Sequence, residues 1–280
     1  MAKKQIKKES HKLVIAISSR ALFNLDHSHQ IFKEEGIEAY AKHQQENESS
    51  VLEPGVGFTL VKKLLKLNSK KTPIDVILLS RNSADTGLRI FNSIEHYGLN
   101  ISRAAFTRGE STHPFVGAFE ADLFLSSNYH DVQKALQSGF AAASIVESKA
   151  DNIHPSQLRI AFDGDAVIFS DESEKIFQEQ GLKAFHENEK LSENVELKAG
   201  PFKSFLVSLQ KIQSTFPEKN NPIRTALVTA RSAPSHKRVI HTMREWGIRI
   251  DESFFLGGLD KGIFLREFAA DIFFDDQQQH

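Results

Sequence analysis

Four carboxylates in the second half of the chain follow short apolar runs. Asp163 and Asp165 come just after LRIAF, and Asp275 and Asp276 come just after DIFF. Ligands of open parallel sheets bind outside the carboxyl ends of the strands, so these side chains are expected to converge. Acids held this close cannot all ionise without a cation, because each raises the pKa of the others. An oxygen cluster without His or Cys favours Mg²⁺ over zinc.

A hydroxyl and an ammonium group are expected at the same edge. Thr229 ends the apolar run TALVT, and Lys261, in GGLDKG, precedes DIFF. Lys237 also lies near TALVT, but we expect it to face solvent on a helix, and Lys261 is favoured. Asp163 and Asp165 taken alone would be typical of solvated or capping residues at a turn. Their combination with the other groups favours catalysis.

The apolar runs that precede these residues are continuous rather than alternating. In chain order they are LVIAI, DVILL, DLFL, AAASIV, LRIAF, TALVT and DIFF. Such runs are typical of strands that are buried on both faces of a parallel sheet. Amphipathic stretches between them predict helices, such as Ser235–Trp246, which Gly247 would end. The sequence therefore predicts an α/β fold with mainly parallel sheets and right-handed crossovers.

The chain contains an internal repeat. Leu13–Tyr40 aligns without a gap on Leu158–Phe185, and Pro73–Asn128 aligns without a gap on Pro222–Gln277. Two domains are therefore predicted, residues 1–150 and residues 151–280, each large enough to bury a core. The polar segment 147–157 would form the boundary. Segments 41–72 and 186–221 match less well, and their helical, charged sequence predicts an insertion over each sheet.

The first copy lacks the acids of the second. At the matching positions it has, in order, Ser18 and Arg20, Ser80, Thr112, and Ser126 and Ser127. This half therefore cannot use a carboxylate nucleophile. Ser18, Arg20, Ser80 and Arg81 would still present donors and positive charge at a strand-end crevice, where they could bind an anion. The alternative is that this half only packs against the catalytic half and shapes its pocket.

Composition excludes several classes of protein. A formal net charge of -1 gives no basic excess, so a nucleic-acid partner is not expected. No apolar run is long enough to span a membrane, and no signal-peptide core follows the first lysines. The chain has no cysteine, which excludes disulfides, thiolate metal sites and a cysteine nucleophile. These features predict a cytoplasmic protein.

The motifs resemble those of a known superfamily. FDGDAVIFSDESE, LVTARS, GLDKG and IFFDDQ occur in the order of the four motifs of haloacid dehalogenase (HAD) phosphatases. More narrowly, AISSRALF, FDGDAVIFSDESE, PIRTALVTARSA and IFFDDQ are similar to cytosolic 5'-nucleotidases of the AMP-preferring class I type. The similarity covers nearly the whole chain. It implies tandem HAD-like (Rossmannoid) units with small helical cap insertions, the first degenerate and the second catalytic.

The resemblance also implies a role for each residue. Asp163 would be the nucleophile that forms an aspartyl-phosphate, and Asp165 would be the general acid and then the general base. Thr229 and Lys261 would hold the transferring phosphoryl oxygens. Mg²⁺ would be held by Asp163, the main-chain carbonyl of Asp165, and the pair Asp275 and Asp276.

These expectations define a predicted function. It is Mg²⁺-dependent hydrolysis of nucleoside 5'-monophosphates, AMP first, with a nucleotide activator bound by the first half. One alternative is a HAD phosphatase for another small phosphomonoester. Another is a nucleotide-binding sensor with little turnover.

The end of the sequence carries one further expectation. After Ser127 the first copy continues through a helix, Asp131–Phe140, to the run AAASIV, whereas the second copy stops four residues after Asp276. Either the chain is truncated, or the first copy or another chain, as in a homo-oligomer, covers that sheet edge.

Overall fold

The computed structural model describes residues 12–69, 73–145, 154 and 156–275. Its strands form two sheets in which every pairing is parallel, with the orders β3-β2-β1-β4-β5 and β8-β7-β6-β9. The first sheet consists of β1 (Leu13–Ser18), β2 (Ile74–Ser80), β3 (Arg103–Phe106), β4 (Leu123–Ser126) and β5 (Ala142–Ser144). The second consists of β6 (Leu158–Phe162), β7 (Ile223–Thr229), β8 (Glu252–Phe255) and β9 (Ile272–Phe274). The predicted α/β class with parallel sheets is confirmed.

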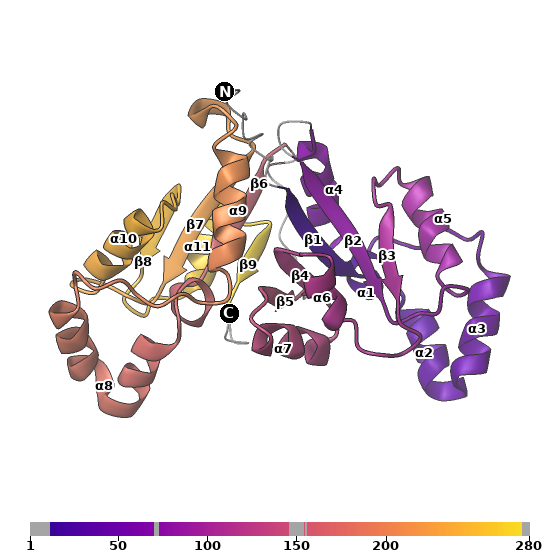
Figure 1. Cartoon of the computed structure of the whole chain (residues 1–280), viewed down its shortest axis with the longest axis horizontal. Coiled ribbons are helices and arrows are strands. Elements are labelled where there is room, and N and C mark those ends of the chain that lie inside the picture. The colour runs from indigo at the N-terminus through magenta and orange to yellow at the C-terminus, as the bar shows by residue number, and fades with distance from the viewer. Residues whose placement is uncertain (1–11, 70–72, 146–153, 155, 276–280) are drawn as a thin grey trace, which may run out of the picture.

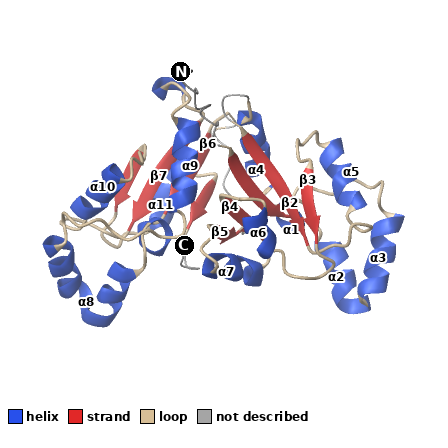
Figure 2. Ribbon diagram, viewed as in Figure 1, coloured by secondary structure: helices blue, strands red, loops and turns tan. Residues whose placement is uncertain are grey.

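Helices flank both sheets (Figure 2). In the first half, residues 12–145, they are α1 (Ser19–Leu22), α2 (Asp26–Glu35), α3 (Ile37–Glu46), α4 (Phe58–Leu67), α5 (Leu88–His96), α6 (Pro114–Ala118) and α7 (Tyr129–Gln137). In the second half, residues 154–275, they are α8 (Glu172–Leu191), α9 (Lys203–Gln213), α10 (His236–Glu245) and α11 (Lys261–Phe268). Two short turns complete this half, η1 (Gly164–Ile168) and η2 (Glu218–Asn220). The predicted helix 235–246 is confirmed as α10.

The sequence patterns missed one strand in each half. These strands, β3 and β8, lie at the edge of their sheets next to β2 and β7. Their residues are partly exposed, and the segments RAAF and ESFF are short. An edge strand is buried less than a central one, so the continuous apolar signal on which the other strands were predicted is weak here.

The helical insertions begin earlier than the sequence predicted. In the second half the insertion is α8, which starts at Glu172 and bends at Gly181. In the first half it is the pair α2 and α3, which meet at Gly36. Both glycines have a positive φ, 82° and 88°, which residues with a side chain rarely adopt. Figure 1 shows α8 and the α2–α3 pair below their two sheets, in similar positions.

The two halves share one interface. Figure 1 shows α4 and α9 near the boundary between the halves, and α4 contacts β6 while α9 contacts β1. One hydrophobic cluster contains buried residues of both halves, such as Ile15, Leu64, Phe162 and Phe205. The sheets are therefore packed against each other through α4 and α9, and a common core fixes their arrangement.

Two predictions from the sequence concern the segment between the two halves and the last strand of the second sheet. The predicted boundary between the domains stays a prediction, because residues 146–153 and 155 lie outside the described residues. Among the described strands, β9 pairs with β6 alone and forms the edge of its sheet.

Among the residues that the structure describes, no helix combines the length and apolar character that crossing a bilayer requires.

Candidate active site

Asp163 lies at the carboxyl end of β6, the strand-end position that the sequence predicted. Its side chain is buried, with the residue 6 % exposed. One carboxylate oxygen, Oδ1, accepts a hydrogen bond of 2.7 Å from the main-chain N–H of Gly164. The other, Oδ2, accepts from Lys261 Nζ at 2.8 Å. Both oxygens are therefore oriented by fixed donors.

Lys261 joins two of the predicted acids. It is the first residue of α11, and its residue is 4 % exposed. Besides Asp163, its ammonium donates to Asp275 Oδ2 at 3.1 Å. Lys237, the alternative from the sequence, has a 55 % exposed side chain and pairs with Glu193 on the surface. The structure thus brings Lys261, and not Lys237, to the end of β6.

Burial sets the electrostatics of this group. Phe162 and Phe274, which precede Asp163 and Asp275, stack in the hydrophobic core with ring centroids 5.3 Å apart. Burial raises the pKa of Asp163 to about 6, although the charge and hydrogen bond of Lys261 act in the opposite direction. Burial alone would lower the pKa of Lys261, but Asp163 and Asp275 raise it above its ordinary value. The ammonium therefore stays charged between the two acids.

Thr229 completes the strand-end group. It is the last residue of β7, next to β6, and is 1 % exposed. A Cβ atom at Gly164 would lie 3.0 Å from Thr229 Oγ1, closer than side chains normally approach. A glycine therefore permits the turn after Asp163 to pass beside the threonine hydroxyl. Residues from β6, β7 and α11 meet here although they are distant in sequence.

The sequence reasoning did not identify Arg231, which binds the fourth predicted residue, Asp165. Its Nε and Nη2 donate to the two carboxylate oxygens of Asp165 at 2.8 and 2.7 Å. The motif LVTARS contains Arg231, but nothing local in the sequence indicates its partner, because Asp165 lies on a different strand end. The main-chain N–H of Arg231 also donates to Thr229 Oγ1 at 3.3 Å.

The predicted Mg²⁺ would be held by the carboxylates of this group. Asp163 and Asp275 direct oxygens at one buried ammonium, which indicates a place for positive charge. Asp165 could contribute its main-chain carbonyl, since its side chain is bound by Arg231. Within the described residues no group of three or more His, Cys, Asp or Glu is arranged around a metal position. Asp276, the remaining predicted ligand, lies outside the described residues, so the metal site stays a prediction.

The residues of the predicted anion site already have partners within the first half. Ser18 Oγ accepts from the main-chain N–H groups of Ala21 and Ser127, both at 3.3 Å. Ser80 Oγ is 3.0 Å from Ser19 Oγ. The two arginines are paired with acids: Arg20 with Asp26 at 3.1 Å, and Arg81 with Asp131 at 2.7 Å. Binding of an external anion by this set stays a prediction.

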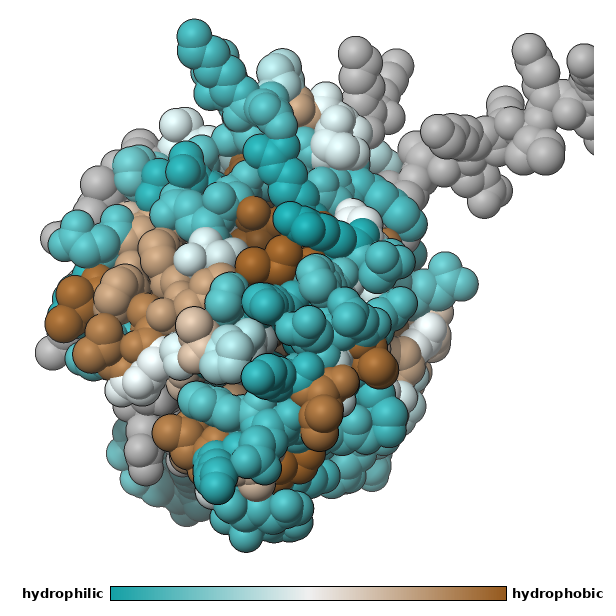
Figure 3. All heavy atoms as spheres, turned by 90° about the vertical axis from the view of Figure 1, so that its left-hand side faces the viewer, coloured by the Kyte–Doolittle hydropathy of each residue, from teal (hydrophilic) through white to brown (hydrophobic). Residues whose placement is uncertain are grey.

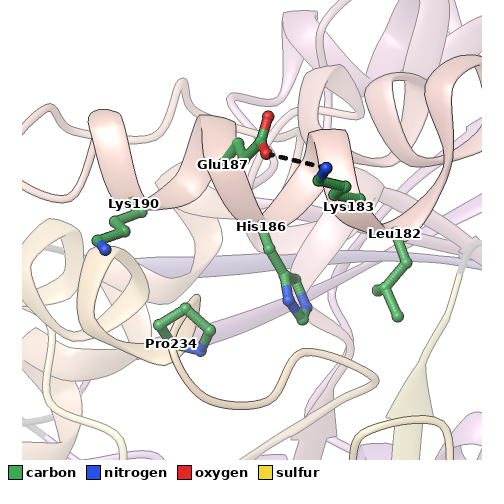
Figure 4. Close-up of a pocket in the computed structure, with 6 residues that line it drawn as sticks. All are labelled: Leu182, Lys183, His186, Glu187, Lys190 and Pro234. Carbon is green, nitrogen blue, oxygen red and sulfur yellow. Dashed lines mark ion pairs between the residues drawn. The ribbon is translucent and has the colours of Figure 1, made fainter.

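An open surface cavity lies between α8 and the loop after β7. Its volume is about 490 Å³, and it is lined by Leu182, Lys183, His186, Glu187, Lys190 and Pro234. In Figure 4, His186 points from α8 toward the Pro234 loop, and Lys183 pairs with Glu187 along the helix. Figure 3 views the side of the molecule that bears α8, where hydrophobic patches interrupt a mainly hydrophilic surface.

Comparison with known proteins agrees with the motifs. A family model described as 5'-nucleotidase matches residues 5–280. The chain belongs to the 5'-nucleotidase family. It is 40 % identical, over 287 residues, to human cytosolic 5'-nucleotidase 1B, and the match covers 98 % of this chain and 47 % of that protein. The chain thus spans about half the length of the curated relative. No solved structure matches it at a significant level.

Proposed function

We propose that this 5'-nucleotidase family member is a Mg²⁺-dependent phosphatase of nucleoside 5'-monophosphates, with AMP the favoured substrate. The observation that carries the proposal is the buried contact of Asp163 with Lys261 at the carboxyl end of β6, where Asp275 joins the same ammonium. A carboxylate nucleophile beside a fixed positive charge suits transfer of a phosphoryl group. The family match and the name of the human relative support the same substrate class.

In the proposed first step, a carboxylate oxygen of Asp163 attacks phosphorus. The bond between phosphorus and the nucleoside 5'-oxygen breaks, and the electron pair leaves with that oxygen. Asp165 delivers a proton to the oxygen, so the nucleoside departs as a neutral alcohol. Lys261 and the hydroxyl of Thr229 stabilise the charge on the phosphoryl oxygens. The product of this step is an aspartyl-phosphate.

In the second step, water attacks phosphorus of the aspartyl-phosphate. Asp165, now a carboxylate, accepts a proton from the water, and the bond between phosphorus and the Asp163 oxygen breaks. Inorganic phosphate is released and Asp163 is restored. Mg²⁺, when held by Asp163, Asp275, Asp276 and the carbonyl of Asp165, would supply charge neutralisation for the phosphoryl group.

Phosphate release from a panel of nucleoside 5'-monophosphates and unrelated phosphomonoesters tests the proposal. AMP is expected to give the highest rate in Mg²⁺, and EDTA is expected to remove the activity until Mg²⁺ is restored. A preference for a non-nucleotide ester would favour a different HAD phosphatase. Saturable AMP binding without turnover would favour the nucleotide sensor.

We further propose that the first half binds a nucleotide activator through Arg20, whose side chain is 39 % exposed at the end of the first sheet. Arg20→Ala is then expected to abolish activation and to leave basal turnover unchanged. Loss of basal turnover would instead assign Arg20 to the substrate pocket or to the interface between the halves.

A further inference from the structure

Arg231 lies at the centre of a buried ionic network. Its side chain is 2 % exposed, and its guanidinium carbon is 5.4 Å from the centre of the Phe185 ring. While Nε and Nη2 bind Asp165, Nη1 donates to Glu189 Oε2 at 2.5 Å. One arginine thus connects a predicted catalytic acid to a second carboxylate.

That second carboxylate belongs to the helical insertion. Glu189 lies near the end of α8, and its side chain is fully buried. Its Oε1 accepts from Ser173 Oγ at 2.8 Å and from Arg238 Nη1 at 3.0 Å. Glu189 is therefore held from two further sides, and Arg231 is held by Glu189.

The first half contains the same network without the central charges. In the pairing of the two halves, the counterparts of Arg231, Phe185 and Arg238 are Asn82, Tyr40 and Arg89. Gln44 follows Tyr40 by four residues, as Glu189 follows Phe185. Tyr40 OH donates to Asn82 Oδ1 at 2.9 Å, and Gln44 Nε2 donates to Tyr40 OH at 2.9 Å. Arg89 Nη1 donates to Gln44 Oε1 at 3.2 Å. Neutral amides occupy the places of the arginine and the glutamate.

This comparison separates two roles of the network. In both halves it connects the helical insertion to the loop after the second strand, so this connection does not require the buried Arg–Glu pair. What differs is the residue at one matching position after the first strand of each half, which is Asp165 in the second half and Arg20 in the first. The Arg–Glu pair thus occurs in the half that has a carboxylate to orient.

We propose that Arg231 is a positioning residue that fixes the carboxylate of Asp165, and that Glu189 of α8 holds Arg231 in place. This inference rests on the proposed function, in which Asp165 transfers the proton. A two-pronged Arg–carboxylate contact sets the plane of the carboxylate as well as its position. Misplacement of a catalytic group by about 1 Å can cost roughly 10²-fold in rate.

The first half supplies the variant that tests this inference. Arg231→Asn with Glu189→Gln copies the neutral network into the second half, and Phe185→Tyr adds the bridging hydroxyl. Because the first half folds with these residues, the triple variant is expected to keep the fold. We expect its kcat/KM for AMP to fall by roughly 10- to 100-fold, with the thermal unfolding curve remaining cooperative.

A double-mutant cycle distinguishes positioning from a structural role. In an Asp165→Asn background the same three changes are expected to alter kcat/KM by less than about threefold, because the residue on which they act has lost its function. An equal loss in both backgrounds, or no loss in the wild-type background, would overturn the proposal.

The leaving group provides a second readout. Proton transfer matters most for an alcohol such as the nucleoside 5'-hydroxyl and little for 4-nitrophenolate. The triple variant should therefore lose kcat/KM for AMP and largely keep it for 4-nitrophenyl phosphate, while a general packing defect lowers both equally. Arg224→Gln, on β7, which breaks a surface pair with Glu252 of β8, is the matched control and should change neither. If the wild-type protein hydrolyses no phosphomonoester, the proposed function itself fails, which is distinguishable from failure of the positioning role in an active enzyme.

Discussion

At the scale of single residues, the buried carboxylates of the two halves differ in their hydrogen-bond partners. In the second half Asp163 is presented between a main-chain N–H and Lys261. In the first half the corresponding residue is Ser18, and a different acid, Asp131 of α7, is buried nearby. Asp131 accepts from Arg81 at 2.9 and 2.7 Å and from Ser111 Oγ at 2.5 Å. Only the first arrangement offers a carboxylate for chemistry; the second uses one for structure.

Asp163→Asn is expected to reduce phosphate release from AMP by at least about 10³-fold, because the amide is a poor nucleophile. The change is nearly isosteric, so circular dichroism should show an unchanged fold. Asp171→Asn, which removes a surface pair with Lys175, is the control and should keep full activity. Substantial turnover by Asp163→Asn would contradict the aspartyl-phosphate mechanism.

The partners of Asp131 predict that the free energy of unfolding depends on pH. Burial alone would raise the pKa of Asp131, but the hydrogen bonds and charge of Arg81, with Ser111, hold it below its ordinary value. A carboxyl group whose pKa is lower in the folded state stabilises the fold above its unfolded pKa of about 3.9. That stabilisation is lost as the pH falls through the folded pKa.

The free energy of unfolding of the wild type and Asp131→Asn measures this effect. At neutral pH we expect a difference of about 1–2 kcal/mol, reduced because Arg81 is partly exposed. The difference should shrink below about pH 4, where the carboxyl of the unfolded chain becomes protonated while that of the folded protein still resists protonation. Asp26→Asn, in an exposed pair, should show little difference at any pH. A constant difference for Asp131→Asn down to pH 3 would exclude the linkage.

At the scale of elements, α8 is the helical insertion of the second half and lies below its sheet in Figure 1. It supplies Glu189 to the buried network and His186 to the cavity opposite Pro234. Glu189 contacts Arg231, which contacts Asp165, so α8 carries residues of the cavity as well as a residue of the network that reaches the candidate site. We therefore expect the nucleoside of the substrate to lie in this cavity.

The variant His186→Ala tests whether the base of the substrate stacks on His186 in this cavity. Loss of stacking between an aromatic side chain and a base typically costs about 1 kcal/mol or more, so KM for AMP should rise roughly fivefold or more. The value of kcat should change little, because the lost contact is the same in the ground and transition states. His96→Ala, on α5 of the first half, is the control. An unchanged KM in His186→Ala would place the base elsewhere.

At the scale of the whole molecule, the interface between the halves repeats one pattern in both directions. Lys63 of α4 donates to Asp271, and Ser208 of α9 donates to Asp122. Each of these acids also accepts from a main-chain N–H of the first strand of its own half, Asp271 from Arg159 and Asp122 from Val14. The polar contacts across the interface thus also hold β6, which ends in the candidate active site, and β1, its counterpart in the first half.

Lys63→Met is expected to lower the free energy of unfolding by roughly 2–4 kcal/mol, because it leaves the partly buried Asp271 without its charge partner. The ammonium also donates to the carbonyls of His154 and Gln157, which would lose a donor. Chemical denaturation measures the change, with Lys66→Met on the exposed face of the same helix as control. Equal stabilities of the two variants would show that Lys63 does not hold the halves together.

The fold class and the central strands could be predicted from the amino-acid sequence alone. Continuous apolar runs such as LRIAF and TALVT identify β6 and β7, because a strand covered on both faces has no polar side to interrupt the pattern. The residue that ends each run was therefore predictable as a strand-end residue, which is how Asp163, Thr229 and Asp275 were found. The order of the four motifs identified the family, which the comparisons confirmed.

Which of these residues are in contact depends on how the elements pack in the folded protein. Three contacts join segments that are far apart in the chain. Lys261, rather than Lys237, binds Asp163. Arg231 binds Asp165, and Arg81 binds Asp131. Periodicity and propensity report on neighbours within a few residues, and they carry no information about a partner on another element. Such pairings follow from the packing of α8, α11 and the parallel strands, which brings side chains together only once the chain is folded.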